Sequence, residues 1–347
     1  MLLTYFLLIM EKKTRKSFIW LAILLLGTIW ILAQRNKQIP YNSINGLVFG
    51  TVYNITYQYD GNLKAEIDAE LKKFDGSLSP FNDTSVITRV NRNEEIVTDT
   101  FFQPCFNRSM EISAETRGAF DITVAPLANA WGFGFKQNSF PDSARIDTLR
   151  QFVGMDLLTL TEGKLQKKYP EITLDASSIA KGLGVDLVAE YFERKGLNDY
   201  MVEIGGEVRA KGQSSKKRPW RIGIDRPEED VTARNRRLQM IAGLSQGALA
   251  TSGNYRNFYV HDGKKYAHTI NPKTGYPVQT EVLSASVYAP TCMEADAYAT
   301  AFMVLGLQKA RQIVLADPEL EGAFIYLEEG KMKNWISPGF EKLIVEK

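Results

Sequence analysis

The first 40 residues have the most uneven hydropathy pattern in the chain. Residues 17–34 carry no charged side chain and are almost entirely apolar, with four basic residues just before them and two just after. A helix of this length, at about 1.5 Å per residue, reaches across a thin hydrocarbon layer. The excess of basic residues on the N-terminal side predicts a cytoplasmic segment over 1–16, a transmembrane anchor over 17–34 and export of the rest of the chain.

Two other interpretations of the segment stay open. A cleaved signal peptide would require small residues before the cleavage point, and Ile31 stands at one of those positions ahead of Ala33. A buried core helix would not explain why Trp20 and Trp30 lie toward the two ends, where interfacial aromatic residues are expected. We favour an uncleaved anchor, with either Met1 or Met10 as the first residue.

From about residue 41 onward, short runs rich in β-branched and aromatic residues alternate with stretches of helical periodicity. Strands are predicted at 46–59 (one or two strands), 171–174, 199–204, 220–224, 240–244 and 283–289. Helices are predicted at 63–74, 102–116, 179–195, 294–305 and 307–315. Strands in hairpin-like groups with interspersed helices predict an α+β fold with antiparallel sheets, formed by a single domain over residues 41–347.

Composition narrows the classes of function. Residues 1–37 hold six basic residues and one acidic residue, so they account for the whole positive excess of the chain and leave a net negative body that is unsuited to nucleic acid. Two His and two Cys are too few for a zinc finger or an Fe–S cluster, which leaves oxygen ligands and hard cations such as magnesium. Cys105 and Cys292 could form a disulfide or remain two buried thiols. The sequence contains neither a GxGxxG nor a P-loop pattern.

Four segments place polar and glycine residues in apolar surroundings, as a binding cleft does. One of them, LDASSIAKG, has Asp175, Ser177 and Ser178 ahead of a helical run, which is the usual pattern of a helix N-cap. Together with Lys181 the same residues could bind an anionic diphosphate. Taken alone, the segment favours capping. The four segments are residues 117–134, 174–192, 250–277 and 290–302.

Two further segments hold residues that allow chemistry without requiring it. Asp296 and Thr300 are four residues apart and share a helix face, so they could bond to the backbone or, with Ser178, supply oxygen ligands to a hard cation. His268 lies in a turn-rich polar segment, which suits either a structural role or proton transfer.

Taken together, the segments resemble the ApbE family of flavin transferases, which use FAD to place FMN on Ser or Thr of target proteins. The resemblance covers nearly all of residues 46–310 in order. It is carried by GAFDITVAPLANAWGFG, LDASSIAKGLGVD, VEIGGEVRAKG, ATSGNY, HTINPKTGYPV and EADAYATAFMVLG. The resemblance implies an ApbE-like (T-fold-like) α+β domain with FAD as substrate and Mg²⁺ as cofactor.

The resemblance also implies roles for individual residues. The positions that fall on the family's magnesium ligands are Ser178, Asp296 and Thr300. Those that fall on its FAD contacts are Phe49, Phe81, Ala119, Phe120, Asp121, Asp175, Lys181, His268 and Ile270. Three positions depart from the family pattern: Phe81 stands where Tyr is common, Asn271 replaces an Asp, and Ala176 replaces a Leu.

In the expected reaction, the hydroxyl of an acceptor protein attacks the FMN phosphorus of FAD and AMP leaves. Charge neutralisation at the diphosphate matters more than covalent help, and His268 or Asp296 is the candidate catalytic base. Water as acceptor would make the chain a FAD pyrophosphatase, and loss of catalysis would make it a membrane-anchored FAD-binding protein. By analogy with the family, we expect an exported or membrane redox protein as acceptor, on the periplasmic side of a bacterial inner membrane.

Overall fold

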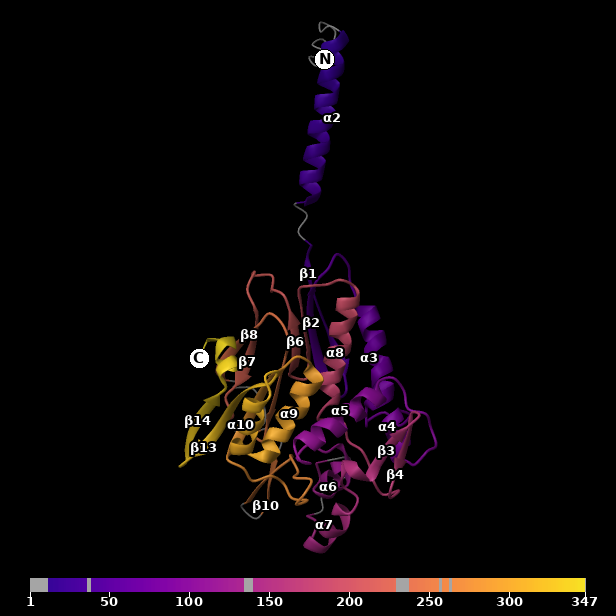
Figure 1. Cartoon of the computed structure of the whole chain (residues 1–347), viewed down its shortest axis with the longest axis vertical. Coiled ribbons are helices and arrows are strands. Elements are labelled where there is room, and N and C mark those ends of the chain that lie inside the picture. Colours follow the sequence, from indigo (N-terminus) through magenta and orange to yellow (C-terminus); the bar gives the residue numbers. More distant parts are fainter. Residues whose placement is uncertain are drawn as a thin grey trace. The chain divides into compact units, whose positions relative to one another are not determined.

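The computed structural model of the chain describes residues 12–35, 39–133, 140–228, 237–255, 258–261 and 264–346. It divides into two compact units, Met1–Tyr41 and Asn42–Lys347. The elements of the second unit appear in Figure 1. The α+β fold with antiparallel sheets is confirmed.

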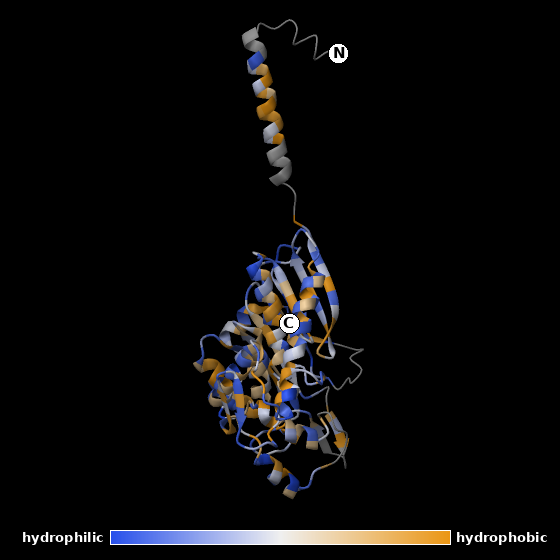
Figure 2. Cartoon of the chain, turned by 90° about the vertical axis from the view of Figure 1, so that its right-hand side faces the viewer, coloured by the Kyte–Doolittle hydropathy of each residue, from blue (hydrophilic) through white to orange (hydrophobic). Residues whose placement is uncertain are grey.

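Helix α2 (Lys12–Arg35) belongs to the first unit, and hydrophobic residues follow one another along its described part (Figure 2). Large apolar side chains between Phe18 and Ile29 are exposed. A membrane span needs about 20 consecutive apolar residues. Among the residues described here, no helix has both the length and the apolar character to cross a membrane, so the anchor predicted over residues 17–34 is not supported.

An eight-stranded sheet forms the centre of the second unit, in the order β1-β2-β5-β6-β9-β12-β13-β14. The pairs with a described register, from β2–β5 through β13–β14, are all antiparallel. The bounds are β1 Tyr41–Val48, β2 Thr51–Gln58, β5 Tyr200–Ile204, β6 Glu207–Lys211, β9 Ala248–Gly253, β12 Val282–Ala289, β13 Glu321–Glu328 and β14 Lys331–Ile336.

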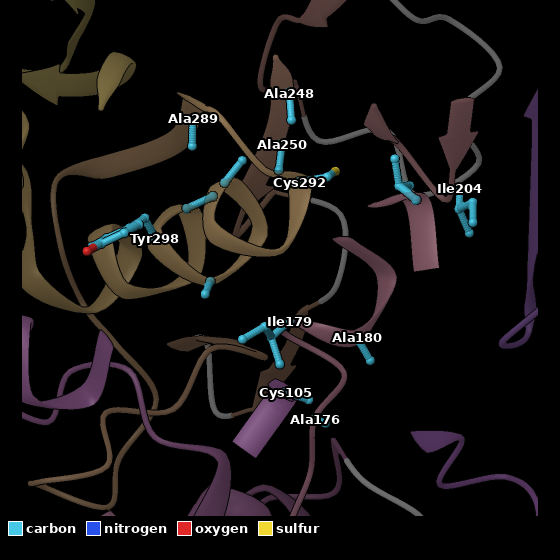
Figure 3. Packing of buried hydrophobic residues seen from close by; sticks show 14 of the residues in the cluster. Cys105, Ala176, Ile179, Ala180, Ile204, Ala248, Ala250, Ala289, Cys292 and Tyr298 are labelled. Carbon is cyan, nitrogen blue, oxygen red and sulfur yellow. The ribbon is translucent and has the colours of Figure 1, made fainter. Parts of the chain in front are cut away.

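Helices α8, α9 and α10 pack on this sheet. Helix α8 (Ala180–Arg194) contacts β5 and β6, α9 (Cys292–Leu305) contacts β9 and β12, and α10 (Leu307–Ala316) contacts β13 (Figure 1). Helix α9 is apolar around most of its circumference and holds the fully buried Ala295, Ala297, Ala299 and Ala301. Such a helix is stable only when other elements cover it on several sides, and here α5 and α8 also contact it. Figure 3 shows buried residues of this region, among them Cys292 and Tyr298.

The remaining helices and strands lie outside the eight-stranded sheet and the helices α8, α9 and α10. The helices are α3 Lys64–Leu78, α4 Val86–Asn91, α5 Phe102–Glu115, α6 Ala125–Ala130, α7 Ser143–Arg150 and α11 Pro338–Leu343. The small sheets pair β3 (Leu158–Thr161) with β4 (Lys164–Lys167), β10 (Phe258–His261) with β11 (Lys264–Ala267), and β8 (Leu238–Leu244) with β7 (Trp220–Asp225) and β15 (Ile344–Glu346). Cys105 and Cys292 are both free and buried, so the open question of a disulfide is answered.

The strand predicted at 171–174 is wrong. Asn91 accepts a hydrogen bond from the Leu174 backbone N–H and donates one to its carbonyl, and Asp175 N–H donates to Ile122 O. A side-chain amide and a turn therefore satisfy the backbone groups that a neighbouring strand would otherwise pair with.

Candidate functional site

A cavity of about 390 Å³ opens where the starts of α8 and α9 meet β6, β9 and the segment before β12. Ten of the predicted site residues line it: Ala119, Phe120, Asp121, Asp175, Ser178, Lys181, His268, Ile270, Asp296 and Thr300. These residues come from four separate stretches of sequence, and their convergence on one cavity is what a binding site requires.

The approach to α8 is a turn that does not cap the helix. Asp175 accepts hydrogen bonds from the Ser177 N–H (2.9 Å) and hydroxyl (2.5 Å). The helix itself begins at Ala180, and its N-cap residue, Ile179, makes no side-chain capping bond. The capping interpretation of Asp175 and the serines is therefore wrong for this helix, and the half-buried Ser178 lines the cavity instead.

Lys181 lies among the acidic groups of the cavity. Its Nζ lies 3.3 Å from Oδ2 and 3.4 Å from Oδ1 of Asp296, and 3.3 Å from Oε1 of Glu207. The same ammonium donates a hydrogen bond to the Ser177 carbonyl oxygen at 3.2 Å. Burial acts to lower the pKa of Lys181, but the carboxylates of Asp296 and Glu207 outweigh it and the pKa is raised. The side chain is thus held as an ammonium ion facing the cavity.

Asp296 is buried on the first turns of α9, and its Oδ2 also accepts a hydrogen bond from Gly182 N–H at 3.1 Å. This contact needs α8 and α9 to approach closely. A Cβ on Gly182 would lie only 2.2 Å from the Cys292 carbonyl oxygen, so glycine alone fits at the crossing.

A buried ion pair between Asp186 and Arg209 holds the start of α9. Asp186 on α8 accepts hydrogen bonds from the N–H groups of Cys292 (2.9 Å) and Met293 (2.8 Å), and Arg209 on β6 donates to it at 2.7 Å. Free N–H groups at a helix start carry partial positive charge, which a carboxylate satisfies. Asp186 therefore fixes the helix that carries Asp296.

Glu207 is a cavity residue that the sequence interpretation missed. It follows the turn of the β5–β6 hairpin, where Gly205 (φ 62°) and Gly206 (φ 105°) adopt conformations that favour glycine; the strand-to-strand turn inferred there is confirmed. Burial raises the pKa of Glu207 above its ordinary range, partly opposed by Lys181. The sequence signal for Glu207 is its place directly after the glycine pair, at the start of a strand in which polar and apolar residues alternate.

The three predicted metal-site residues share the cavity. Thr300 Oγ1 lies 3.2 Å from Ser252 Oγ, beside Asp296 and Ser178. Within the described residues, no group of three or more His, Cys, Asp or Glu side chains could hold a metal ion. One carboxylate and two hydroxyls form a sparse oxygen set, which fits magnesium when phosphate and water complete the coordination.

His268 lies in the wall of the cavity, half-buried, with its ring 6.5 Å from that of Phe133. The turn that follows it is fixed by Asn271, whose side-chain oxygen accepts from the N–H groups of Lys273 (2.9 Å) and Thr274 (3.3 Å). Asn271 therefore fills the turn-forming position where the family has Asp. Gly134, at the end of the WGFG segment, lies outside the described residues.

Asp121 is buried at the edge of the cavity. Its Oδ1 accepts from the Thr123 N–H (2.8 Å) and hydroxyl (2.5 Å), which starts a short 3₁₀ turn over Ile122–Val124. Burial raises the pKa of Asp121 to about 6, although these hydrogen bonds act in the opposite direction. A buried carboxyl that is partly protonated near neutral pH can donate as well as accept a hydrogen bond.

Phe49 and Phe81 do not line the cavity. Phe49 has φ 53° beside Gly50 (φ 71°), and its ring packs edge-on against Phe74 at 5.0 Å. Phe81 is 71% exposed and lies close to Gly50. Phe49 thus forms part of a turn outside the cavity and Phe81 lies beside that turn, and their predicted role in flavin binding stays a prediction.

Known proteins are similar to this chain in sequence and in architecture. The ApbE family profile matches residues 49–324. A Haemophilus influenzae protein named FAD:protein FMN transferase is 38% identical over 299 residues, covering 81% of this chain and 86% of its own length. The structure titled Flavin Transferase ApbE from Vibrio cholerae superposes with a TM-score of 0.78 at 33% identity, covering 88% of this chain and 99% of its own. The Pseudomonas stutzeri flavinyl transferase ApbE gives 0.79 at 29% identity, covering 89% and 98%. The chain belongs to the ApbE family.

Proposed function

We propose that the protein is a magnesium-dependent FAD:protein FMN transferase. It binds FAD, transfers FMN to a Thr or Ser hydroxyl of an acceptor protein through a phosphoester bond, and releases AMP. The observation that carries the proposal is the single cavity in which Lys181, Asp296, Thr300 and Ser178 converge. The names of the relatives described above support the same activity.

The chemistry of the cavity suits diphosphate cleavage. Lys181 offers an ammonium to the diphosphate, and Ser178, Asp296 and Thr300 offer oxygen ligands to a magnesium ion. When bound, the cation would neutralise charge on the bridging and leaving oxygens. Asp296 is already oriented by Gly182 N–H and Lys181, so it is fixed before any ligand arrives.

The same contacts favour His268 over Asp296 as the base. Both oxygens of Asp296 already accept hydrogen bonds from Lys181 Nζ, and Oδ2 also accepts from Gly182 N–H, so this carboxylate is engaged in holding the cavity together. In the proposed step the acceptor hydroxyl oxygen bonds to the FMN phosphorus, the bond from that phosphorus to the AMP phosphate breaks, and the hydroxyl proton passes to His268. General-base catalysis of this kind contributes about 10²- to 10⁴-fold.

The test measures AMP release and covalent flavin on an acceptor protein, with and without Mg²⁺, using the full-length chain. We expect magnesium-dependent AMP release that matches flavin incorporation. Asp296→Ala should lower both by about 100-fold or more, because it removes preorganised charge at the reacting group. Asp83→Ala, which removes an exposed surface carboxylate, serves as the control and should change neither.

Two results would replace the proposal. AMP release that is equal with and without acceptor would make the protein a FAD pyrophosphatase. FAD that binds but stays intact under every condition would make it a non-catalytic FAD-binding protein.

We also propose that the domain works outside the bacterial cytoplasmic membrane, on an exported or membrane redox acceptor. The support is the charge asymmetry around residues 17–34 and the exposed apolar side chains of α2. Alkaline phosphatase fused after residue 347 should be active in cells, because it folds only after export. An inactive fusion that is present at a normal level would contradict the proposed location.

A further inference from the structure

Glu207 has no part in the reaction proposed above, yet it is an acidic residue buried in the reaction cavity. Its side chain is 7% exposed, and within the described part of the chain its Oε2 has no hydrogen-bond partner. Its Oε1 lies 3.3 Å from Lys181 Nζ. A buried carboxyl oxygen without a hydrogen-bond partner is costly, so its retention here needs an explanation.

Lys181 is shared between two carboxylates. Its Nζ is 3.3 Å from Glu207 Oε1 and 3.3 Å from Asp296 Oδ2, so neither partner holds it alone. One ammonium therefore faces two acidic groups, one from β6 and one from α9. Two acidic side chains, Asp296 and Glu207, therefore share the one ammonium of Lys181.

Binding of a divalent cation changes this balance, if the proposed function holds. A cation bound to Asp296 would lie close to the Lys181 ammonium, whose Nζ is 3.3 Å from the same carboxylate. The two positive charges would repel each other. Lys181 has a flexible four-carbon stem, and its Cδ already lies near Gly205, in the turn that leads to Glu207. Glu207 is then the anion within reach that can retain the ammonium in the cavity.

We propose that Glu207 is a positioning residue for Lys181: it retains the ammonium at the diphosphate side of the cavity when a divalent cation takes Asp296. This inference rests on the proposed function. Without Glu207, Lys181 has only Asp296 as a counter-charge and competes with the cation for it. Glu207 thus lets one cavity hold two positive charges, one from the chain and one from the cation.

The test measures Mn²⁺ affinity from the EPR signal of free Mn²⁺, with ADP present as a diphosphate that carries no flavin. The chains compared are the full-length wild type, Glu207→Gln, Lys181→Met and the double variant. Glu207→Gln should weaken Mn²⁺ binding by about 10- to 100-fold, as loss of outer partners of metal ligands commonly does. In the Lys181→Met background the same substitution should change the affinity by less than about 3-fold, because its target is gone.

Glu203→Gln is the matched control. It makes the same chemical change in the same hairpin, on a side chain that accepts from Gly206 N–H (2.7 Å) and Asn54 (2.6 Å) instead of facing Lys181. Its Mn²⁺ affinity should equal that of the wild type. If Glu207→Gln fails to fold, Glu207→Asp keeps the charge with a shorter reach and should weaken Mn²⁺ binding to a smaller extent.

Two outcomes would overturn the inference alone: an unchanged affinity in folded Glu207→Gln, or an equal loss in both backgrounds, which would mean that Glu207 acts on the cation through space. A wild type that does not bind Mn²⁺ with ADP would instead overturn the metal site of the proposed function, and this inference with it.

Discussion

Gly182 is the residue at which the fold and the site depend most directly on each other. Substitution by alanine adds a Cβ that would lie 2.2 Å from Cys292 O, 2.6 Å from Cys292 C and 2.8 Å from Met293 Cα. All three atoms belong to the backbone of α9, so no side chain can rotate away. Since ordinary contact begins near 3.4 Å, the starts of α8 and α9 must separate by roughly 1 Å.

This separation should have two measurable costs. Overpacking of a close helix contact costs about 1–3 kcal/mol of the free energy of unfolding. The 3.1 Å hydrogen bond from Gly182 N–H to Asp296 would lengthen beyond a useful range, which exposes a buried charge to a further cost of about 1.5–3 kcal/mol. We therefore expect Gly182→Ala to lower the free energy of unfolding by about 2.5–6 kcal/mol.

Activity should fall more steeply than stability suggests. A displacement of about 1 Å in a positioned group can cost about 100-fold in rate, and Asp296 would move by that amount relative to Lys181. The assays are urea denaturation and FMN transfer, the latter at a temperature where the variant is folded. Transfer at that temperature should fall by about 100-fold.

Gly76→Ala is the matched control for the same substitution. Gly76 lies within α3, and a Cβ there would meet nothing within 4 Å. Alanine should stabilise that helix by up to about 1 kcal/mol and leave transfer unchanged. The reasoning would be refuted if Gly182→Ala unfolded within about 1 kcal/mol of the wild type and transferred FMN at a similar rate.

Three further predictions follow from the buried charges and the turn. Asp121 has its pKa raised from 3.8 to about 6, so it contributes stability that is present below pH 4 and is lost as pH rises to 6, worth about 3 kcal/mol. Asp121→Asn should remove this loss, seen as a difference from the wild type in urea denaturation that changes by about 2–2.5 kcal/mol between pH 4 and pH 7. Arg209→Met leaves Asp186 buried without its ion pair and should lower the free energy of unfolding by about 3–5 kcal/mol; a loss below about 1 kcal/mol would contradict that. Asn271→Asp keeps the oxygen that accepts from the turn N–H groups, so thermal unfolding should stay within about 0.5 kcal/mol of the wild type.

The hydropathy pattern predicts the helices well because the helices are long. The predicted range 179–195 corresponds to α8, and 294–305 corresponds to α9, within two residues at each end. The strand at 171–174 was wrong because its backbone partners are the side chain of Asn91 and Ile122 O, which no local pattern reveals. β13 and β14 were missed, although β12, which pairs with β13, was predicted.

Those parts of the candidate site whose residues lie close together in the sequence could be predicted. Asp175, Ser178 and Lys181 lie within seven residues of one another, and Asp296 and Thr300 lie on one helix face, so each group is visible in a short window. That the two groups meet follows from the contact of α8 with α9 at Gly182, which only the fold supplies. Glu207 was missed because its burial depends on β6 lying between β5 and β9, beneath the start of α8.

The crossing of α8 and α9 also explains why the cavity needs a second acidic group. With the helices close enough for Gly182 N–H to reach Asp296, this carboxylate has little room for water, and its charge must be balanced by protein groups. Lys181 supplies the balancing charge in the described structure. A cation that displaces Lys181 from Asp296 would leave an ammonium in a cavity that solvates it poorly, unless another anion stood beside it. Glu207 stands there, at the end of the hairpin turn against which the Lys181 stem packs, so the geometry that fixes Asp296 also requires Glu207.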